Sequence, residues 1–298
     1  MLTSPVNEIK LVVFNITIIF TRYSEPDNFA HEHLTALEAQ IGVTGEIIFL
    51  DQKPSAQMKL FVDNKTFGSL TARYVECEAR GLSFARNKGL KCAKFELVLF
   101  TDPDTIPSRS WAYWLAHTLK KGELDEVAIV GGRCILHWCG GRPWLAGARP
   151  VADVLGDFHL SDDVCEVDAV VGMSMALNLA VAGSGKNGRY FSTNLGRMNG
   201  NLMSGEDTEI CYRYRMAGKK ILYEPRSITA HRVTPDRAQL SWIMRRLVYG
   251  GYSRAMIGNR PRVDRISGVS QLSYLPFILP PWAIGFVAGM IRRLINRK

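Results

Sequence analysis

The chain has 298 residues, of which 47% are hydrophobic and 22% are charged. This length allows one large domain or two modest ones, and the balanced composition without low-complexity tracts excludes a disordered or fibrous protein. The net charge of +9 is concentrated near the C-terminus: from Arg226 onward there are 13 Lys or Arg against two Asp, while the rest has 24 basic and 26 acidic residues. Such asymmetry points to a polyanionic partner, either nucleic acid or an anionic membrane.

The first apolar run, residues 11–20, is interpreted as a buried strand. It contains Asn15 and Thr17, and it lacks both a basic start and a small-residue cleavage pattern, so a signal peptide is not expected. The six cysteines are scattered along the chain. We therefore expect reduced thiols in a cytoplasmic protein.

Short apolar runs alternate with helix-like segments in the first half of the chain. Nearly continuous apolar runs of this length are typical of strands covered on both faces. Residues 27–40 have helical spacing, with Asp27 as the expected cap, and residues 83–94 form a second such segment. These segments lie between the apolar runs. This order predicts an α/β fold with a mostly parallel sheet, in which ligands bind outside the carboxyl ends of the strands. The predicted strands are residues 16–20, 46–50, 95–100 and 127–130.

Two carboxylates follow the third predicted strand, in the sequence Asp102-Pro103-Asp104. Residues two apart in an extended chain project to the same side, so both carboxylates can converge on one cation, and Pro103 restricts the backbone between them. Oxygen ligands suit Mg²⁺ or Mn²⁺, and a cation there would neutralise charge on a diphosphate. The same tripeptide is also ordinary turn chemistry, so the motif alone leaves a turn and a metal site open.

A second acidic pair, Glu206 and Asp207, lies at the start of a predicted helix. Ser204 is the expected N-cap, with Asp207 in the place of the usual capping-box glutamate, and Gly218 is expected to end the helix. The partial positive charge of a first helical turn favours an ionised carboxylate, which a general base must be before it accepts a proton. Capping alone would also explain both acidic residues.

These motifs belong to a longer succession. Residues 82–89, Leu-Ser-Phe-Ala-Arg-Asn-Lys-Gly, precede the strand that leads to 101–104, and residues 205–210 precede a predicted strand at 221–225 and then His231. The succession resembles family 2 glycosyltransferases with the GT-A fold, in which an Ala-Arg-Asn-x-Gly helix precedes an Asp-x-Asp strand end, and a Glu-Asp helix is followed by a strand and a histidine. The resemblance runs from about residue 16 to His231.

The resemblance implies a Rossmann-like GT-A catalytic domain over residues 1–235, with a mostly parallel sheet and flanking helices. It also implies a nucleotide-sugar donor bound with Mg²⁺ or Mn²⁺. By matching position, the resemblance implies Asp207 as the catalytic base, with Glu206 as the second candidate. It implies a donor site formed by Thr21, Asp51, Arg86, Asp102 and Asp104. It implies a metal site formed by Asp102, Asp104 and His231.

The activity implied is a single displacement with inversion, in which one sugar passes from a donor, expected to be a UDP-sugar, to a hydroxyl of a saccharide or lipid-linked acceptor. Arg86 and the cation would stabilise the departing diphosphate. Processive relatives carry a Gln-x-x-Arg-Trp motif, which the segment from Gln239 to Trp242 does not match. One sugar per encounter is therefore expected.

Two other classes are compatible with parts of this pattern. A sugar nucleotidyltransferase should open with a Gly-rich phosphate loop after its first strand, where this chain has Thr21-Arg22-Tyr23. A non-catalytic membrane adaptor with a GT-A-like fold would not need its carboxylates. Six glycines between residues 183 and 205 predict a loop that is either a lid over the donor or a flexible surface segment.

The C-terminal region, residues 236–298, combines basic charge with an uncharged apolar stretch at 275–291. The apolar stretch is short for a span, which needs about 20 residues, and Pro276, Pro280 and Pro281 are expected to interrupt a helix in its first half. An interfacial or re-entrant anchor on the inner face of the plasma membrane is favoured, with a buried helix as the alternative. The partner expected is thus an anionic membrane surface rather than nucleic acid.

Overall fold

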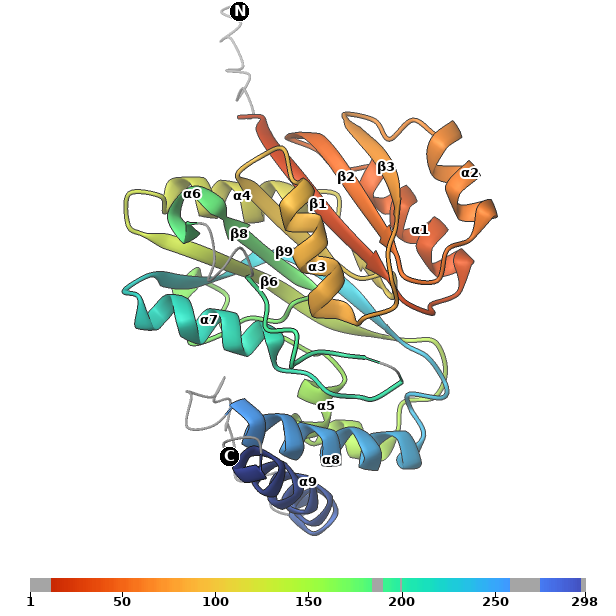
Figure 1. The fold of residues 1–298 in the computed structure, drawn as a ribbon, viewed down its shortest axis with the longest axis vertical. Helices are drawn as coiled ribbons and strands as arrows, with labels where there is room; N and C mark the ends of the chain where they lie inside the picture. The colour runs from red at the N-terminus through yellow and green to blue at the C-terminus, as the bar shows by residue number, and fades with distance from the viewer. Residues whose placement is uncertain (1–11, 184–189, 199, 258–273, 296–298) are drawn as a thin grey trace, which may run out of the picture.

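The computed structural model describes residues 12–183, 190–198, 200–257 and 274–295, and it shows a mixed β-sheet with helices on both faces (Figure 1). Along the sheet the order is β3-β2-β1-β4-β8-β6-β9-β5, with β7 pairing with β9. The strands are β1 (Phe14–Arg22), β2 (Val43–Asp51), β3 (Leu70–Glu76), β4 (Leu97–Thr101), β5 (Thr105–Pro107), β6 (Val127–Trp138), β7 (Cys165–Glu166), β8 (Ser174–Asn178) and β9 (Lys220–Val233).

The N-terminal half of the sheet is parallel, as predicted. β1 pairs with β2 and β4, and β2 pairs with β3, all in parallel. In the other half β8 runs antiparallel between β4 and β6, so the sheet as a whole is mixed. The four predicted strands correspond to β1, β2, β4 and β6, and the carboxyl ends of β1 and β4 meet at one edge.

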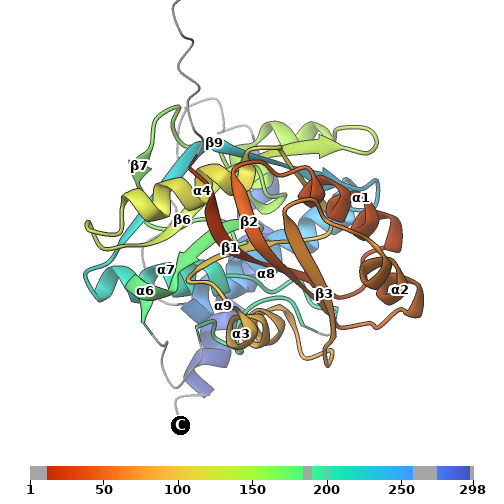
Figure 2. The same ribbon diagram turned by 90° about the horizontal axis from the view of Figure 1, so that it is seen from above.

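Helices cover both faces of the sheet, as the view from above shows (Figure 2). One core contains side chains of α1, α2 and α4, and the other contains side chains of α3 and α7. Alternate residues of β1 enter the two cores, with Ile18 in the first and Ile19 in the second, as the two-residue repeat of a strand requires. These helices are α1 (Asp27–Glu38), α2 (Ala56–Asn64), α3 (Leu82–Cys92), α4 (Trp111–Lys121), α6 (Leu179–Ala182) and α7 (Glu206–Met216).

A third apolar cluster lies below the sheet in Figure 1, where α8 (Leu240–Ile257) and α9 (Leu275–Ile295) pack beside η1 (Trp144–Gly147) and α5 (Arg149–Val154). The predicted boundary at residue 235 falls between β9 and α8. Glycines bring α8 and α9 into backbone contact: a Cβ on Gly251 would lie 1.9 Å from the Trp282 carbonyl oxygen, and one on Gly285 would lie 1.8 Å from that of Val248.

The proline interruption predicted for the C-terminal apolar stretch was wrong, because α9 is continuous through Pro280 and Pro281. A proline removes its own N–H and crowds the carbonyl four residues earlier, which here is that of Pro276 or Phe277. The disturbance is therefore confined to the first turns of the helix, and the contact with α8 around Gly285 lies beyond it.

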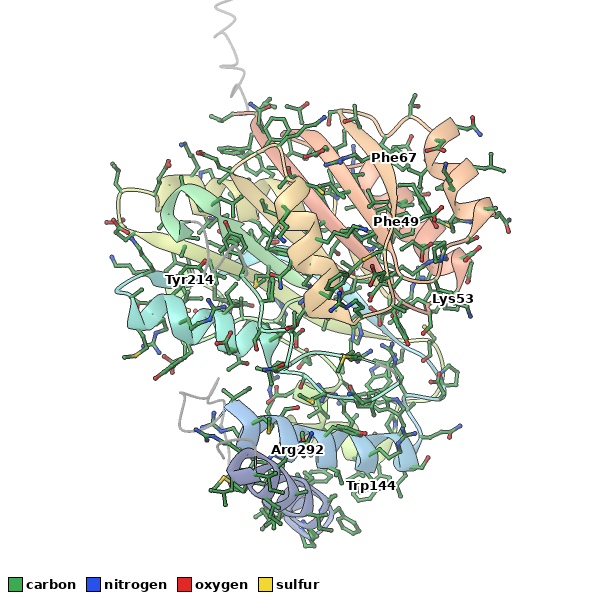
Figure 3. All side chains as sticks on the ribbon, in the orientation of Figure 1. Phe49, Lys53, Phe67, Trp144, Tyr214 and Arg292 are labelled. Carbon is green, nitrogen blue, oxygen red and sulfur yellow. The ribbon has the colours of Figure 1, made fainter. Side chains whose placement is uncertain are left out.

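Most of α9 is exposed, so the alternative of a buried C-terminal helix is not what the structure shows. The helix has 21 residues and is long and apolar enough to cross a membrane by length and composition. Trp144 and Arg292 mark this end of the molecule in Figure 3. The exposed large apolar side chains of α9 are those of Leu275, Phe277, Leu279, Ile284, Val287, Met290, Ile291, Leu294 and Ile295.

Candidate active site

A cavity of about 1050 Å³ opens at the carboxyl ends of β1 and β4. Its walls include Thr21 from β1, Asp102 and Asp104 after β4, and the start of α7 with Asp207. Its floor is formed by residues of α8 and α9. The cavity therefore lies where ligands bind in open α/β sheets, and it brings together the two acidic motifs found in the sequence.

Asp102-Pro103-Asp104 is both a turn and part of the cavity wall. The Asp102 carbonyl oxygen accepts hydrogen bonds from the Thr105 backbone N–H (3.1 Å) and from its hydroxyl (2.8 Å), which closes the turn. The Asp102 carboxylate accepts from the Thr21 hydroxyl at 3.4 Å and from Arg86 at 3.3 Å. The two interpretations of the motif are therefore compatible, because the turn directs the Asp102 side chain across the cavity.

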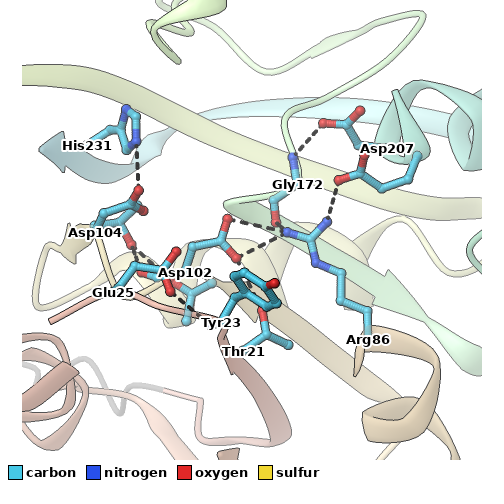
Figure 4. A network of polar contacts seen from close by, with 12 residues as sticks. Thr21, Tyr23, Glu25, Arg86, Asp102, Asp104, Gly172, Asp207 and His231 are labelled. Carbon is cyan, nitrogen blue, oxygen red and sulfur yellow. Dashed lines mark hydrogen bonds and ion pairs between the residues drawn. The ribbon is translucent and has the colours of Figure 1, made fainter. Parts of the chain in front are cut away.

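His231 lies next to Asp104 because β5 pairs antiparallel with β9, with Thr105 opposite His231. The backbone N–H of Arg232 also donates to the Asp104 carbonyl oxygen at 2.8 Å. His231 Nε2 is 3.4 Å from Asp104 Oδ2, and Figure 4 shows the two side chains facing each other. A strand register thus joins residues 127 positions apart in the sequence.

Arg237 completes this corner of the cavity. It donates to Asp104 Oδ2 at 2.6 Å and to His231 Nε2 at 3.2 Å. Burial alone would raise the pKa of Asp104, but Arg237 and His231 hold it well below its ordinary value. His231 Nδ1 is 2.6 Å from the Leu155 carbonyl oxygen, which can only accept, so Nδ1 carries a proton and donates it there.

Asp104 and His231 are close enough to bind one divalent cation, and the Asp102 carboxylate is bonded to Arg86. The Nδ1–H of His231 is held by a carbonyl oxygen, as is usual for metal-binding histidines, and Nε2 and Asp104 Oδ2 are close enough to bind one ion together. In the described parts of the chain, no three His, Cys, Asp or Glu side chains form a metal-binding group. The Asp102 carboxylate is held by Arg86 and the Asp104 carboxylate by Arg237, so the metal set of Asp102, Asp104 and His231 stays a prediction.

Arg86, from α3, connects the two acidic motifs (Figure 4). Its side chain is 1% exposed and donates to Asp102 at 3.3 Å, to Glu206 at 3.2 Å and to the Gly172 carbonyl oxygen at 3.1 Å. A Cβ on Gly172 would lie 2.5 Å from Arg86 Nη1, so only glycine allows this approach. The hydrogen bonds of Arg86 go to the protein, so it positions the carboxylates. It also lines the cavity, and its contact with a diphosphate stays a prediction.

Asp207 is partly exposed in the cavity wall, whereas Glu206 is buried. Asp207 accepts hydrogen bonds from the backbone N–H of Gly172 at 3.1 Å and of Thr208 at 2.7 Å, which fix its carboxylate. Burial, and then the charge of Asp207, raises the pKa of Glu206 to about 7, although Arg86 opposes the shift. Asp207 is thus the carboxylate of this pair that is placed to accept a proton from a ligand in the cavity.

Two predicted helix caps were wrong. α7 begins at Glu206 with Gly205 as its N-cap, and Gly205 has a φ of 99°, a conformation that favours glycine; Ser204 therefore lies outside the helix. α1 begins at Asp27 with Pro26 as its N-cap. Asp27 instead forms an ion pair with Arg22. Both acidic residues of α7 still lie in its first turn, as expected.

Thr21 lines the cavity, but Asp51 does not. Asp51 is fully buried, because Arg22 lies opposite it in the β1–β2 register and donates to both of its oxygens, and Tyr74 adds a hydrogen bond of 2.7 Å. Donor binding by Asp51 stays a prediction. Its neighbour Gln52 lines the cavity instead, and its side-chain oxygen accepts from the Gly81 N–H at 2.9 Å.

Sequence reasoning missed several cavity residues. Arg237, Arg246 and Arg197 line the cavity. The excess of basic residues in the C-terminal part was the only signal for Arg237 and Arg246, and Arg197, which precedes that part, had none. Gln52 and Gly172 had no signal. In the glycine-rich segment that was predicted as a loop, residues 184–189 and 199 lie outside the described residues.

No protein-family model matches the chain. Among curated proteins it is similar to the glucosyl-dolichyl phosphate glucuronosyltransferase of Haloferax volcanii, with 25% identity over 202 residues that cover 64% of this chain and 61% of that protein. It is also similar to the pre-mycofactocin glycosyltransferase of Mycobacterium tuberculosis, with 28% identity over 218 residues that cover 73% and 43%. The chain thus spans less than two thirds of either relative.

Solved structures of glycosyltransferases share the fold. The mannosyltransferase PcManGT from Pyrobaculum calidifontis, in complex with GDP-Man and Mn²⁺, has a TM-score of 0.56 at 20% identity over 93% of this chain and 75% of that one. TarS of S. aureus, in complex with UDP, has a TM-score of 0.51 at 16% identity over 87% and 74%. The predicted GT-A fold and the resemblance to glycosyltransferases are confirmed.

Proposed function

We propose that this member of the family 2-type glycosyltransferases with the GT-A fold transfers one sugar, with inversion, from a nucleotide-sugar to a hydroxyl of a saccharide or lipid-linked acceptor. The observation that carries the proposal is that Asp104 with His231 and Asp207 lie on the wall of one cavity, with Arg86 bonded both to Asp102 and to the first turn of α7. One side of the cavity offers a pair of metal ligands, and the other offers a base.

On the donor side, Asp104 and His231 would hold Mg²⁺ or Mn²⁺, with donor phosphates and water as the remaining ligands. The cation would neutralise negative charge on the departing diphosphate. Thr21 and Gln52 line the same part of the cavity and are placed to contact the nucleoside. A UDP-sugar is the donor favoured by the sequence, and because PcManGT was solved with GDP-Man, GDP-sugars belong in the same test.

On the acceptor side, Asp207 removes the proton of the attacking hydroxyl while the oxygen bonds to the anomeric carbon and the bond from that carbon to the diphosphate breaks. The hydrogen bonds from Gly172 and Thr208 hold the Asp207 carboxylate in place. Arg86 lies between the two sides and is bonded both to Glu206 and to Asp102. It therefore keeps the donor side and the acceptor side of the cavity at a fixed separation.

We place the enzyme on the cytoplasmic face of a membrane through α8 and α9. α9 has an exposed apolar face and carries Arg292 and Arg293 in its last turn, an arrangement that favours an interface containing anionic lipids. α9 is packed on α8, and α8 contacts α5 below the catalytic cavity. This packing supports an interfacial position of the helix pair. Neither a sugar nucleotidyltransferase nor a non-catalytic adaptor is named among the relatives described above.

A donor panel tests the proposal. The full chain is incubated with UDP-, GDP- and dTDP-sugars, with Mn²⁺, Mg²⁺ or EDTA, and release of the nucleoside diphosphate is measured with and without acceptor. We expect release with one nucleotide class only, dependent on a divalent cation and lost in Asp104→Ala. Release that is equal in EDTA, or equal in Asp104→Ala, would overturn the metal-dependent mechanism.

A further inference from the structure

The floor of the catalytic cavity has a surface that the proposed transfer reaction does not use. It is formed by one face of α8, with Arg246, Leu247 and Gly250, and by the first turns of α9, with Ile278 and Trp282. Other side chains of α9 are the exposed apolar ones that favour a lipid interface. A single helix pair therefore forms both the floor of the cavity and the apolar end of the molecule seen in Figure 3.

Arg246 is the charged group on this floor, and it lacks an acidic partner among the residues of the described ranges. Its Nη1 donates to two neutral acceptors, the Leu202 carbonyl oxygen at 3.1 Å and the Ser204 hydroxyl at 3.3 Å, and its buried Nε has no hydrogen-bond partner there. Arg22 and Arg86, two buried arginines close to the site, are each paired with two carboxylates.

The surroundings of Arg246 favour an anion. Burial lowers the pKa of Arg246 to about 10, and the charge of Arg197 adds to the decrease, while Glu206 and Asp207 partly oppose it. A half-buried cation without a carboxylate partner is costly, and an incoming anion with several acceptor oxygens would reduce that cost through charge-assisted hydrogen bonds. Arg197 lines the same cavity and can contact the same anion.

We propose that this floor binds the phosphate of a lipid-linked acceptor saccharide, with Arg246 and Arg197 on the phosphate and the lipid chain along the apolar wall of α8 and α9. This inference rests on the proposed function, and it names the acceptor class: a sugar joined through phosphate to a hydrocarbon chain. The sugar hydroxyl then reaches Asp207, which takes its proton as the new glycosidic bond forms and the nucleoside diphosphate leaves.

The position of Arg246 favours the acceptor phosphate over the diphosphate of the donor. Its two hydrogen bonds go to Leu202 and Ser204, in the segment that leads into α7 and the proposed base. The donor side already has a cation of its own, because Arg237 is bonded to Asp104 and His231. A neutral glycolipid would leave the charge of Arg246 unpaired, so phosphate is the group that the floor recognises.

Binding measured without any donor tests the inference. The full chain in a neutral detergent is titrated with dodecyl phosphate, dodecyl glucoside and inorganic phosphate, which separates lipid phosphate from lipid alone and from phosphate alone. Arg246→Gln removes the charge on the floor. Arg245→Gln is the matched control, because Arg245 is the exposed neighbour on the same helix and does not line the cavity.

We expect dodecyl phosphate to bind at least tenfold more tightly than either other probe. Arg246→Gln should weaken it roughly tenfold to a hundredfold, as for loss of a charged hydrogen bond, while Arg245→Gln leaves it unchanged. Equal binding of dodecyl glucoside or inorganic phosphate, or equal losses in the two variants, would overturn the inference. So would displacement of dodecyl phosphate by UDP or GDP together with a matching loss of nucleotide affinity in Arg246→Gln. A chain that binds dodecyl phosphate but transfers no sugar would refute only the proposed function.

Discussion

Replacing Arg86 with methionine, which has a similar length and no charge, should destabilise the protein strongly. Arg86 is 1% exposed and is bonded to Glu206, which is almost as buried, and to Asp102. Removing one partner of a buried ion pair leaves the other charge uncompensated and costs about 3–5 kcal/mol. In a chain of this size that corresponds to a decrease in melting temperature of roughly 10 °C. Lys91→Met, an exposed position on the same helix, should change the melting temperature by roughly 2 °C at most.

The pH dependence separates this cause from a simple packing defect. The pKa of Glu206 is raised from 4.5 to about 7 in the folded chain, so its contribution to stability is present below pH 4.5 and is lost as the pH rises through 7. Without Arg86 the pKa of Glu206 rises further, and ionising it costs more. Differential scanning fluorimetry should therefore show a larger deficit of Arg86→Met at pH 8 than at pH 5. A deficit that is equal at both pH values, or no larger than that of Lys91→Met, would refute this reasoning.

Three further outcomes are expected from the same geometry. Asp104→Asn and His231→Ala should each reduce the Mn²⁺-dependent gain in nucleotide affinity about tenfold or more. Calorimetry with and without Mn²⁺ measures this gain, and an undiminished gain in both variants would exclude the two residues as metal ligands. Gly172→Ala places a methyl group 2.5 Å from Arg86 Nη1 and should cost about 1–3 kcal/mol, visible as a lower melting temperature, whereas an unchanged value would show that Arg86 can move freely. Ile284→Glu, at a position 65% exposed on α9, should weaken co-sedimentation with anionic vesicles about tenfold without lowering the melting temperature, and unchanged sedimentation would contradict the interfacial position of the helix.

The sequence predicted those parts of the fold that depend on local pattern. Nearly continuous apolar runs, such as the one around Ile18, indicated strands covered on both faces, and β1, β2 and β4 lie in the parallel half of the sheet. The antiparallel insertion of β8 between β4 and β6 had no local signal, because strand direction depends on long-range pairing. The prolines of α9 were overinterpreted, since their effect is limited to the first turns of the helix.

In the site, residue type and order identified the carboxylates but not their partners. Asp51 follows a buried strand just as Asp102 does, yet the β1–β2 register places Arg22 opposite Asp51 and removes it from the cavity. Arg237 and Arg246 come from the C-terminal part of the chain, where the sequence showed only a general excess of positive charge. Which basic residue enters the cavity depends on how α8 packs, and the pattern of charge along the chain does not contain that information.

The most direct test of the central claim is the rate of sugar transfer by Asp207→Asn at saturating donor and Mn²⁺, with nucleotide affinity measured in parallel. A positioned general base contributes about 10²–10⁴-fold to such a reaction, so we expect transfer to fall by that factor while the nucleotide still binds as in the wild type. Transfer at the wild-type rate in Asp207→Asn would contradict the assignment of Asp207 as the base of a glycosyltransferase site.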